Sequence, residues 1–74
     1  MERDRIITVD PEVMSGTPVF AGTRVPVESL IAHLKAGETL EDFLAGFPNV
    51  RREQAEAFLE LALRAALGGH ARAA

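Results

Sequence analysis

The chain has 74 residues, enough for one small domain and too few for two. Hydrophobic residues make up 47% of it, which excludes wholesale disorder. The chain has no cysteine and only two histidines, so it has no disulfide and almost no ligands for a structural metal. We therefore expect a partner chain to support the small core. The net charge of −3 argues against non-specific nucleic-acid binding. A charged start without a long apolar run predicts a soluble, cytoplasmic protein.

Strand signals lie in residues 5–25 and predict a short N-terminal β-hairpin. Residues 6–9 are β-branched, and the segments 18–20 and 23–25 flank a turn in which Gly22 supplies a positive φ. Three prolines in this region each remove a ladder donor, so the strands should be short or lie at an edge. An exposed edge would favour pairing with another chain.

From Pro26 onward the hydrophobic period changes from two to 3.6, which is typical of helices. The predicted helices span about 26–36, 39–47 and 50–67. Pro26 suits the first helical position, and Gly37 suits the end of the first helix. Thr39 can cap the second helix together with Asp42. Hairpin and helices make a single domain over residues 1–67.

The third predicted helix carries more apolar residues than one contact with a core needs. One apolar stripe consists of Ala55, Phe58, Leu61, Ala62 and Ala65, and a second ridge beside it consists of Leu59, Leu63 and Leu67. Either the small alanines merely widen the core face or the second ridge docks on a partner, and we favour the partner. Gly68 and Gly69 predict the end of this helix, with residues 68–74 as a frayed tail.

Residues suited to catalysis are scarce. There is no cysteine, and no neighbouring third group is evident that would orient His33 as a base for either serine. Glu41 and Asp42 are adjacent in sequence, so on a helix they point in different directions and do not favour a shared proton or a metal. The sequence therefore predicts no enzymatic activity, no cofactor and no metal site.

The second and third helices, braced by the first, have the outline of a helix-turn-helix. In that arrangement the first residues of the last helix face the major groove, which makes Arg51, Arg52 and Gln54 candidates for DNA binding. The alternative, weighted equally, is that both arginines are solvated or pair with Glu53, Glu56 or the acidic second helix.

Residues 5–66 resemble family 433 of domains of unknown function. The resemblance rests on an Asp-Pro-Glu turn, then Gly-x-Pro-Val, then Gly-Thr-Arg-x-Pro-Val, and finally an aromatic residue and proline before the last helix. The motif positions are occupied by Asp10, Pro11, Gly16, Pro18, Gly22, Thr23, Arg24, Pro26, Gly37 and Pro48. We interpret most of these residues as structural, the glycines and prolines because they shape turns, and we expect Arg24 to pair with a carboxylate such as Asp10 or Glu12. The family tends to place Ser or Thr where this chain has Arg51, so the cap of the last helix is expected at Asn49.

The resemblance implies a mainly α fold: a short N-terminal β-hairpin followed by a three-helix, homeodomain-like helix-turn-helix core. It also implies an antitoxin that inhibits a PIN-like ribonuclease toxin and regulates its own operon by binding DNA. Leu59, Leu63 and Leu67 would then anchor the toxin, while Arg64 or Arg72 would enter its acidic cleft. The alternative is a dimeric interaction module with no toxin or DNA role. A homodimer is expected through either the hairpin or the third helix.

Overall fold

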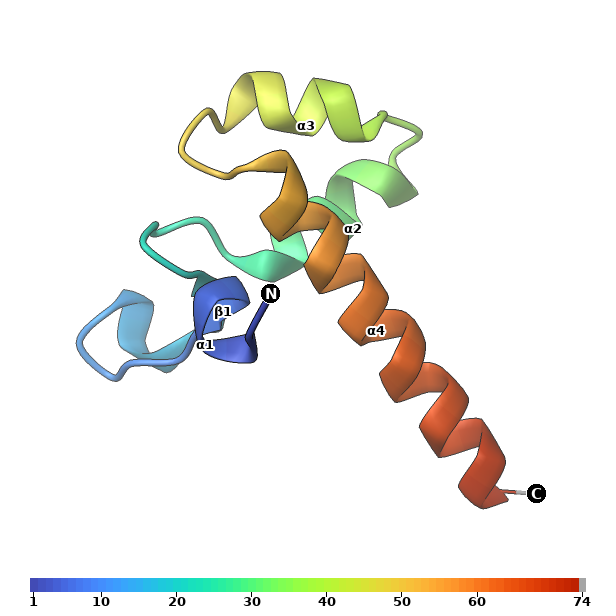
Figure 1. Ribbon diagram of the computed structural model, residues 1–74. Helices are drawn as coiled ribbons and strands as arrows, with labels where there is room; N and C mark the ends of the chain where they lie inside the picture. The colour runs from blue at the N-terminus through green and yellow to red at the C-terminus, as the bar shows by residue number, and fades with distance from the viewer. Residues whose placement is uncertain (74) are drawn as a thin grey trace.

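The computed structural model describes residues 1–73, with side chains described for residues 1–68. Its elements are α1 (Arg3–Ile6), β1 (Ile7–Thr8), the 3-10 turn η1 (Met14–Gly16), β2 (Val19–Phe20), α2 (Val27–Lys35), α3 (Leu40–Gly46) and α4 (Arg52–Ala73). The fold is mainly helical with a two-stranded antiparallel sheet near the N-terminus, as predicted. α3 lies across one end of α2 and α4, and the C-terminal half of α4 projects away from the other elements (Figure 1). No helix in the described part of the chain is long and apolar enough to cross a membrane.

The sheet pairs different segments from those predicted. β1 runs antiparallel to β2, with Ile7 opposite Phe20 and Thr8 opposite Val19. The predicted return strand at residues 23–25 forms no ladder. The backbone N–H of Phe20 donates to the carbonyl of Val25 (2.9 Å), and an isolated bridge joins Val19 to Pro26. The ladder stops because the N–H of Val25 is donated to the Thr23 hydroxyl and the following proline has no N–H.

The short helix α1 was not predicted, because four residues are too few to show a helical period. Ile6, expected in a strand, is its last residue and is buried at 3% exposure. α1 packs against α4, so the N-terminal segment is held by tertiary contact rather than by a long strand pairing.

α2 and α3 lie where the sequence placed them. Pro26 is the residue before α2 rather than its first helical residue, and the chain leaves α2 through Gly37, whose φ of +89° favours glycine. α3 begins with a capping box: the Thr39 hydroxyl accepts the backbone N–H of Asp42 (3.1 Å), and the Asp42 carboxylate accepts the backbone N–H of Thr39 (3.0 Å).

α4 is longer than predicted and starts later. It begins at Arg52, with the Gln54 side-chain oxygen accepting the backbone N–H of Arg51 (3.4 Å), so Asn49 lies in the preceding turn and is not its cap. It continues through Gly68 and Gly69 to Ala73, which corrects the predicted end of the helix at residue 67. Glycine lowers helix stability without forbidding helical φ and ψ, and the tail beyond it is rich in alanine.

The core lies where α2, α3 and the first half of α4 meet β2. Its buried members are Phe20, Leu30, Phe43, Val50 and Ala55. The Phe20 ring lies 6.1 Å from that of Phe43 and 5.7 Å from that of Phe58, measured between centroids, so β2 is packed into the helical layer. Because the core ends near Phe58, the later residues of α4 have no neighbouring element to cover them (Figure 1).

Candidate functional site

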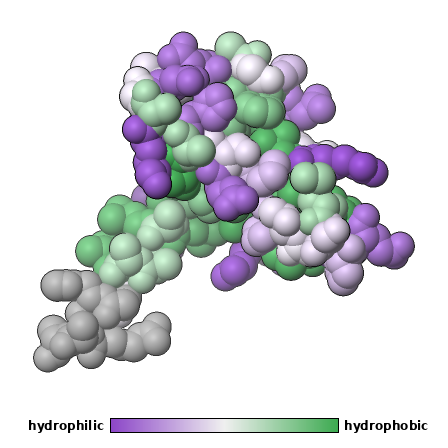
Figure 2. Space-filling view, turned by 180° about the vertical axis from the view of Figure 1, so that it is seen from behind, coloured by the Kyte–Doolittle hydropathy of each residue, from purple (hydrophilic) through white to green (hydrophobic). Residues whose placement is uncertain are grey.

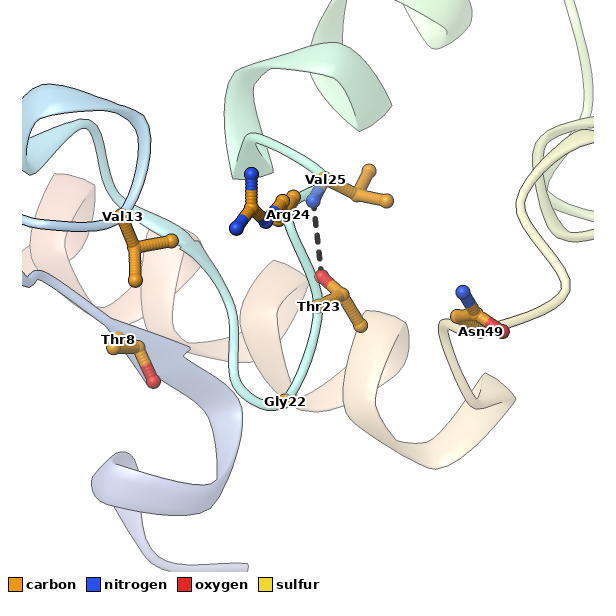
Figure 3. A pocket seen from close by; sticks show the side chains of 7 residues that line it. All are labelled: Thr8, Val13, Gly22, Thr23, Arg24, Val25 and Asn49. Atoms are coloured by element: carbon orange, nitrogen blue, oxygen red, sulfur yellow. Dashed lines mark hydrogen bonds between the residues drawn. The ribbon is translucent and has the colours of Figure 1, made fainter.

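The motif turn Gly22–Thr23–Arg24 forms one wall of a surface hollow of about 560 Å³ (Figure 3). The other lining residues are Thr8, Val13, Val25 and Asn49. They come from β1, the connection that follows it, the end of the turn and the junction between α3 and α4. The hollow therefore gathers segments that are far apart in sequence, which the sequence alone did not predict.

The turn is held by its own hydrogen bonds. Gly22 has a φ of +78°, and the Thr23 hydroxyl donates to the carbonyl of Phe20 (2.8 Å) while accepting the N–H of Val25 (3.0 Å). Two other motif residues also shape the backbone: Gly16 ends η1 with a φ of +86°, and Pro26 directly precedes α2. These contacts give Arg24 a fixed backbone position.

Arg24 does not pair with Asp10 or Glu12, contrary to the expectation. Within the described part of the chain, no carboxylate lies within 4.0 Å of its guanidinium. Asp10 instead accepts the backbone N–H of Glu12 through Oδ1 (2.9 Å), which stabilises the turn after β1. Arg24 is exposed at the hollow, on the opposite side of Thr23 from the Asn49 amide (Figure 3). A cation and an amide suit a carboxylate or phosphate group, whereas a metal cation would need carboxylates that this hollow lacks among the described residues.

Gln54 is a structural residue, which corrects its assignment to a DNA-reading face. It is buried at 3% exposure, and its amide nitrogen donates to the carbonyls of Arg5 (3.1 Å) and Ala21 (2.9 Å) and lies 3.5 Å from that of Ile6. The side chain thus joins α4 to α1 and to the Gly22 turn. It cannot reach a DNA base without breaking these contacts.

Arg52 is engaged by carboxylates, as the alternative interpretation expected. Its guanidinium lies 2.6 Å from Glu41 of α3 and 3.5 Å from Glu56 one turn along α4. The hydrogen bond from Arg52 lowers the pKa of Glu41, and the same bond raises the pKa of Arg52. Two neighbouring negative charges oppose contact between Arg52 and a phosphate backbone.

Arg51 is exposed and, with Arg5, Met1 and Glu2, lines a second open hollow of about 640 Å³. Of the three residues predicted to read DNA, it alone is exposed without an ion pair in the described structure. Because α1 packs against α4, part of the surface that a groove-reading helix would present is covered.

The leucines of the predicted partner ridge become more exposed along α4. Leu59 is half-buried and packs on the core, whereas Leu63 and Leu67 are exposed at 51% and 57%. Arg64 lies beside them, exposed at 74% and 3.5 Å from Glu60 in the predicted i,i+4 pair. Seen from behind, the coloured part of α4 that projects from the core, before the grey residues, presents a mostly hydrophobic surface (Figure 2). The Arg72 side chain lies outside the described residues.

His33 has an orienting neighbour that the sequence analysis missed. Its Nδ1 lies 2.8 Å from a carboxylate oxygen of Glu38, and its ring packs edge-on against Phe43 and Phe47. The Gly37 turn brings Glu38 back toward α2, so only knowledge of that turn would have revealed the pair. Among the described residues, neither serine hydroxyl forms a hydrogen bond with this histidine ring. The His33–Glu38 contact instead joins the last turn of α2 to the segment that follows the helix.

These features define a small helical protein with an N-terminal two-stranded sheet, a cationic turn and a projecting apolar helix. The family model described as protein of unknown function DUF433 matches residues 7–62, and the chain belongs to that family. Over 49 residues it is 41% identical to uncharacterized protein y4eO of Sinorhizobium fredii, a match that covers 66% of this chain and 22% of that protein. The crystal structure of a DUF433 member from Anabaena variabilis is similar, with a TM-score of 0.71 and 27% identity over 81% of this chain and 59% of that one. The chain thus corresponds to only part of the length of both relatives.

Proposed function

We propose that this chain acts in the cytoplasm as the antitoxin of a type II toxin–antitoxin pair and binds a PIN-like ribonuclease through the projecting half of α4. The observation that carries the proposal is the exposure of Leu63 and Leu67 on a helix that extends beyond the core. The family resemblance supplies the class of partner, and the exposed helix supplies a surface on which such a partner would bind.

Apolar anchors suit this role because exposed ion pairs contribute only about 0 to 1 kcal/mol each. Leu63 and Leu67 lie one turn apart and would enter adjacent sites on a partner surface. Arg64, already on the same half of α4, would supply a cation to a nuclease cleft that holds Mg²⁺ with carboxylates. Helix and cation together fit an inhibitor that covers an acidic active site.

Autoregulation by DNA binding has weaker support in the geometry. Gln54 is buried and Arg52 is paired with two carboxylates, which leaves Arg51 as the one predicted DNA contact that is exposed without an ion pair among the described residues. We therefore propose that the complex contacts operator DNA through Arg51 and the phosphate backbone, rather than by base recognition through Gln54.

Co-expression with the product of the neighbouring gene tests the antitoxin role. We expect that product to arrest growth when expressed alone, and the present chain to restore growth and co-purify with it. Leu63→Glu combined with Leu67→Glu should abolish rescue, because two buried charges would face the partner. The matched control is Val9→Glu, which places the same charge at an apolar position exposed at 62% on the other part of the molecule. A harmless neighbour that fails to associate would refute the proposal and leave the interaction module without a toxin role.

A further inference from the structure

A face of α2 remains without an assigned role. Glu28, Ile31, Ala32 and Lys35 follow one another at i, i+3, i+4 and i+7, so they share one side of the helix. All four line a hollow of about 590 Å³ between α2 and α4, whose other walls are Val27, Ser29 and Phe58. We call these four residues the α2 face.

The charges of the α2 face are arranged symmetrically about its centre. Glu28 and Lys35 are exposed, have opposite sign and lie two helical turns apart, about 10 Å along the axis. Neither is within 4.0 Å of an oppositely charged group in the described structure. Between them are Ile31, which is half-buried, and Ala32, which is exposed and small enough to allow another helix to approach closely.

We infer that the α2 face binds a second copy of this chain, with the two α2 helices antiparallel about a twofold axis near Ile31 and Ala32. In that arrangement Glu28 lies opposite Lys35 of the partner subunit, and Lys35 lies opposite Glu28 of the partner subunit. A parallel arrangement about a twofold axis would place like charges opposite each other. The charge pattern is therefore complementary to itself in one orientation, as an isologous interface requires.

This interface is distinct from the surface used in the proposed function. On α4 the hollow is lined by Phe58, and Leu63 lies five residues later, about 140° around the helix. The dimer would cover the hollow between α2 and α4 and leave Leu63 and Leu67 exposed. One chain can thus form a homodimer and bind a different partner, and neither proposal depends on the other.

A dimer at this position would also add buried apolar surface to the small core. A domain of this length hides only about 60% of its unfolded surface, and here it has no disulfide. Covering Ile31 and the exposed edge of Phe58 would add apolar burial next to Leu30 and Phe43. The inferred interface extends the core rather than forming a separate patch.

Charge reversal provides the test. Sedimentation velocity at low salt is measured for the full chain, for Glu28→Lys, for Lys35→Glu and for the double variant carrying both changes. The wild type is expected to be a dimer, each single variant to weaken dimerisation at least tenfold, and the double variant to restore it. An equimolar mixture of the two single variants should form a heterodimer, because one copy then carries two lysines at the α2 face and the other two glutamates. Glu12→Lys, which reverses a charge in an exposed loop, is the control.

Circular dichroism establishes that each variant is folded, so a loss of dimer is not mistaken for unfolding. A monomeric wild type would overturn the inference. So would single variants that dimerise as tightly as the wild type, or a mixture that shows no preference for the heterodimer. If Leu63→Glu dissociates the dimer while the charge reversals do not, the copies meet through the α4 ridge and the assignment to α2 is wrong.

Discussion

Replacement of Gln54 is expected to show that this residue fastens the N-terminal segment to α4. Gln54→Met keeps the length of the side chain but removes its donor from the carbonyls of Arg5 and Ala21, at 3.1 and 2.9 Å. Each bond contributes about 1 kcal/mol, and the contact with Ile6 at 3.5 Å is too long to add much. We therefore expect the free energy of unfolding to fall by about 2 kcal/mol.

Gln54→Ala should cost more, because it also removes the buried Cγ methylene group, worth about 0.8 kcal/mol. A total of about 3 kcal/mol is a large share of the roughly 4 to 11 kcal/mol expected for a chain of this length. Urea unfolding followed by circular dichroism measures both variants, and a loss of 2 kcal/mol lowers the midpoint by about 1 to 2 M.

Hydrogen exchange adds a readout that a general loss of packing would not give. The amides of α1 and of the Gly22 turn should exchange faster in Gln54→Met, while those of α3 keep their relative protection, because α3 makes no hydrogen bond to Gln54 among the described residues. A loss below about 0.5 kcal/mol in Gln54→Met, or unchanged exchange in α1, would refute the structural role and reopen its assignment to DNA.

Three further predictions concern local structure. Thr39→Ala removes one half of the α3 capping box and should cost about 1 kcal/mol in thermal unfolding, whereas an unchanged midpoint would show that the cap does not stabilise α3. The hydrogen bond from the Thr39 backbone lowers the pKa of Asp42, so its carboxylate stabilises the fold above the unfolded pKa and that contribution disappears as pH falls through the folded pKa. Below about pH 4 the wild type should therefore lose stability more steeply than Asp42→Asn, and parallel pH curves would contradict this. Gly22→Ala should destabilise by about 1 kcal/mol through its φ of +78°, whereas Gly46→Ala, at a helical glycine also free of neighbours within 4 Å, should be neutral or stabilising in the same urea assay.

Local interactions explain which parts of this protein its sequence predicts. The capping box of α3 joins residues three apart, the Gly22 turn joins Phe20 to Thr23, and Glu60 reaches Arg64 one turn later. Each depends on side chains that are close in sequence, so spacing alone indicates them. The exposed ridge at Leu63 and Leu67 was likewise evident, because a helix with two apolar stripes has more surface than one small core can cover.

Long-range contacts decided the rest. Gln54 looks like a surface residue at the start of a helix until its amide meets the carbonyls of Ala21, 33 residues away, and Arg5, 49 residues away. Arg52 is neutralised by Glu41 across the α3–α4 junction, eleven residues earlier. Periodicity gives the direction in which a side chain leaves its own helix but not what the rest of the chain places there. The sequence by itself therefore determined α2, α3 with its capping box and the existence of a long last helix, whereas only the tertiary structure decided which polar residues of these helices are free to meet a partner.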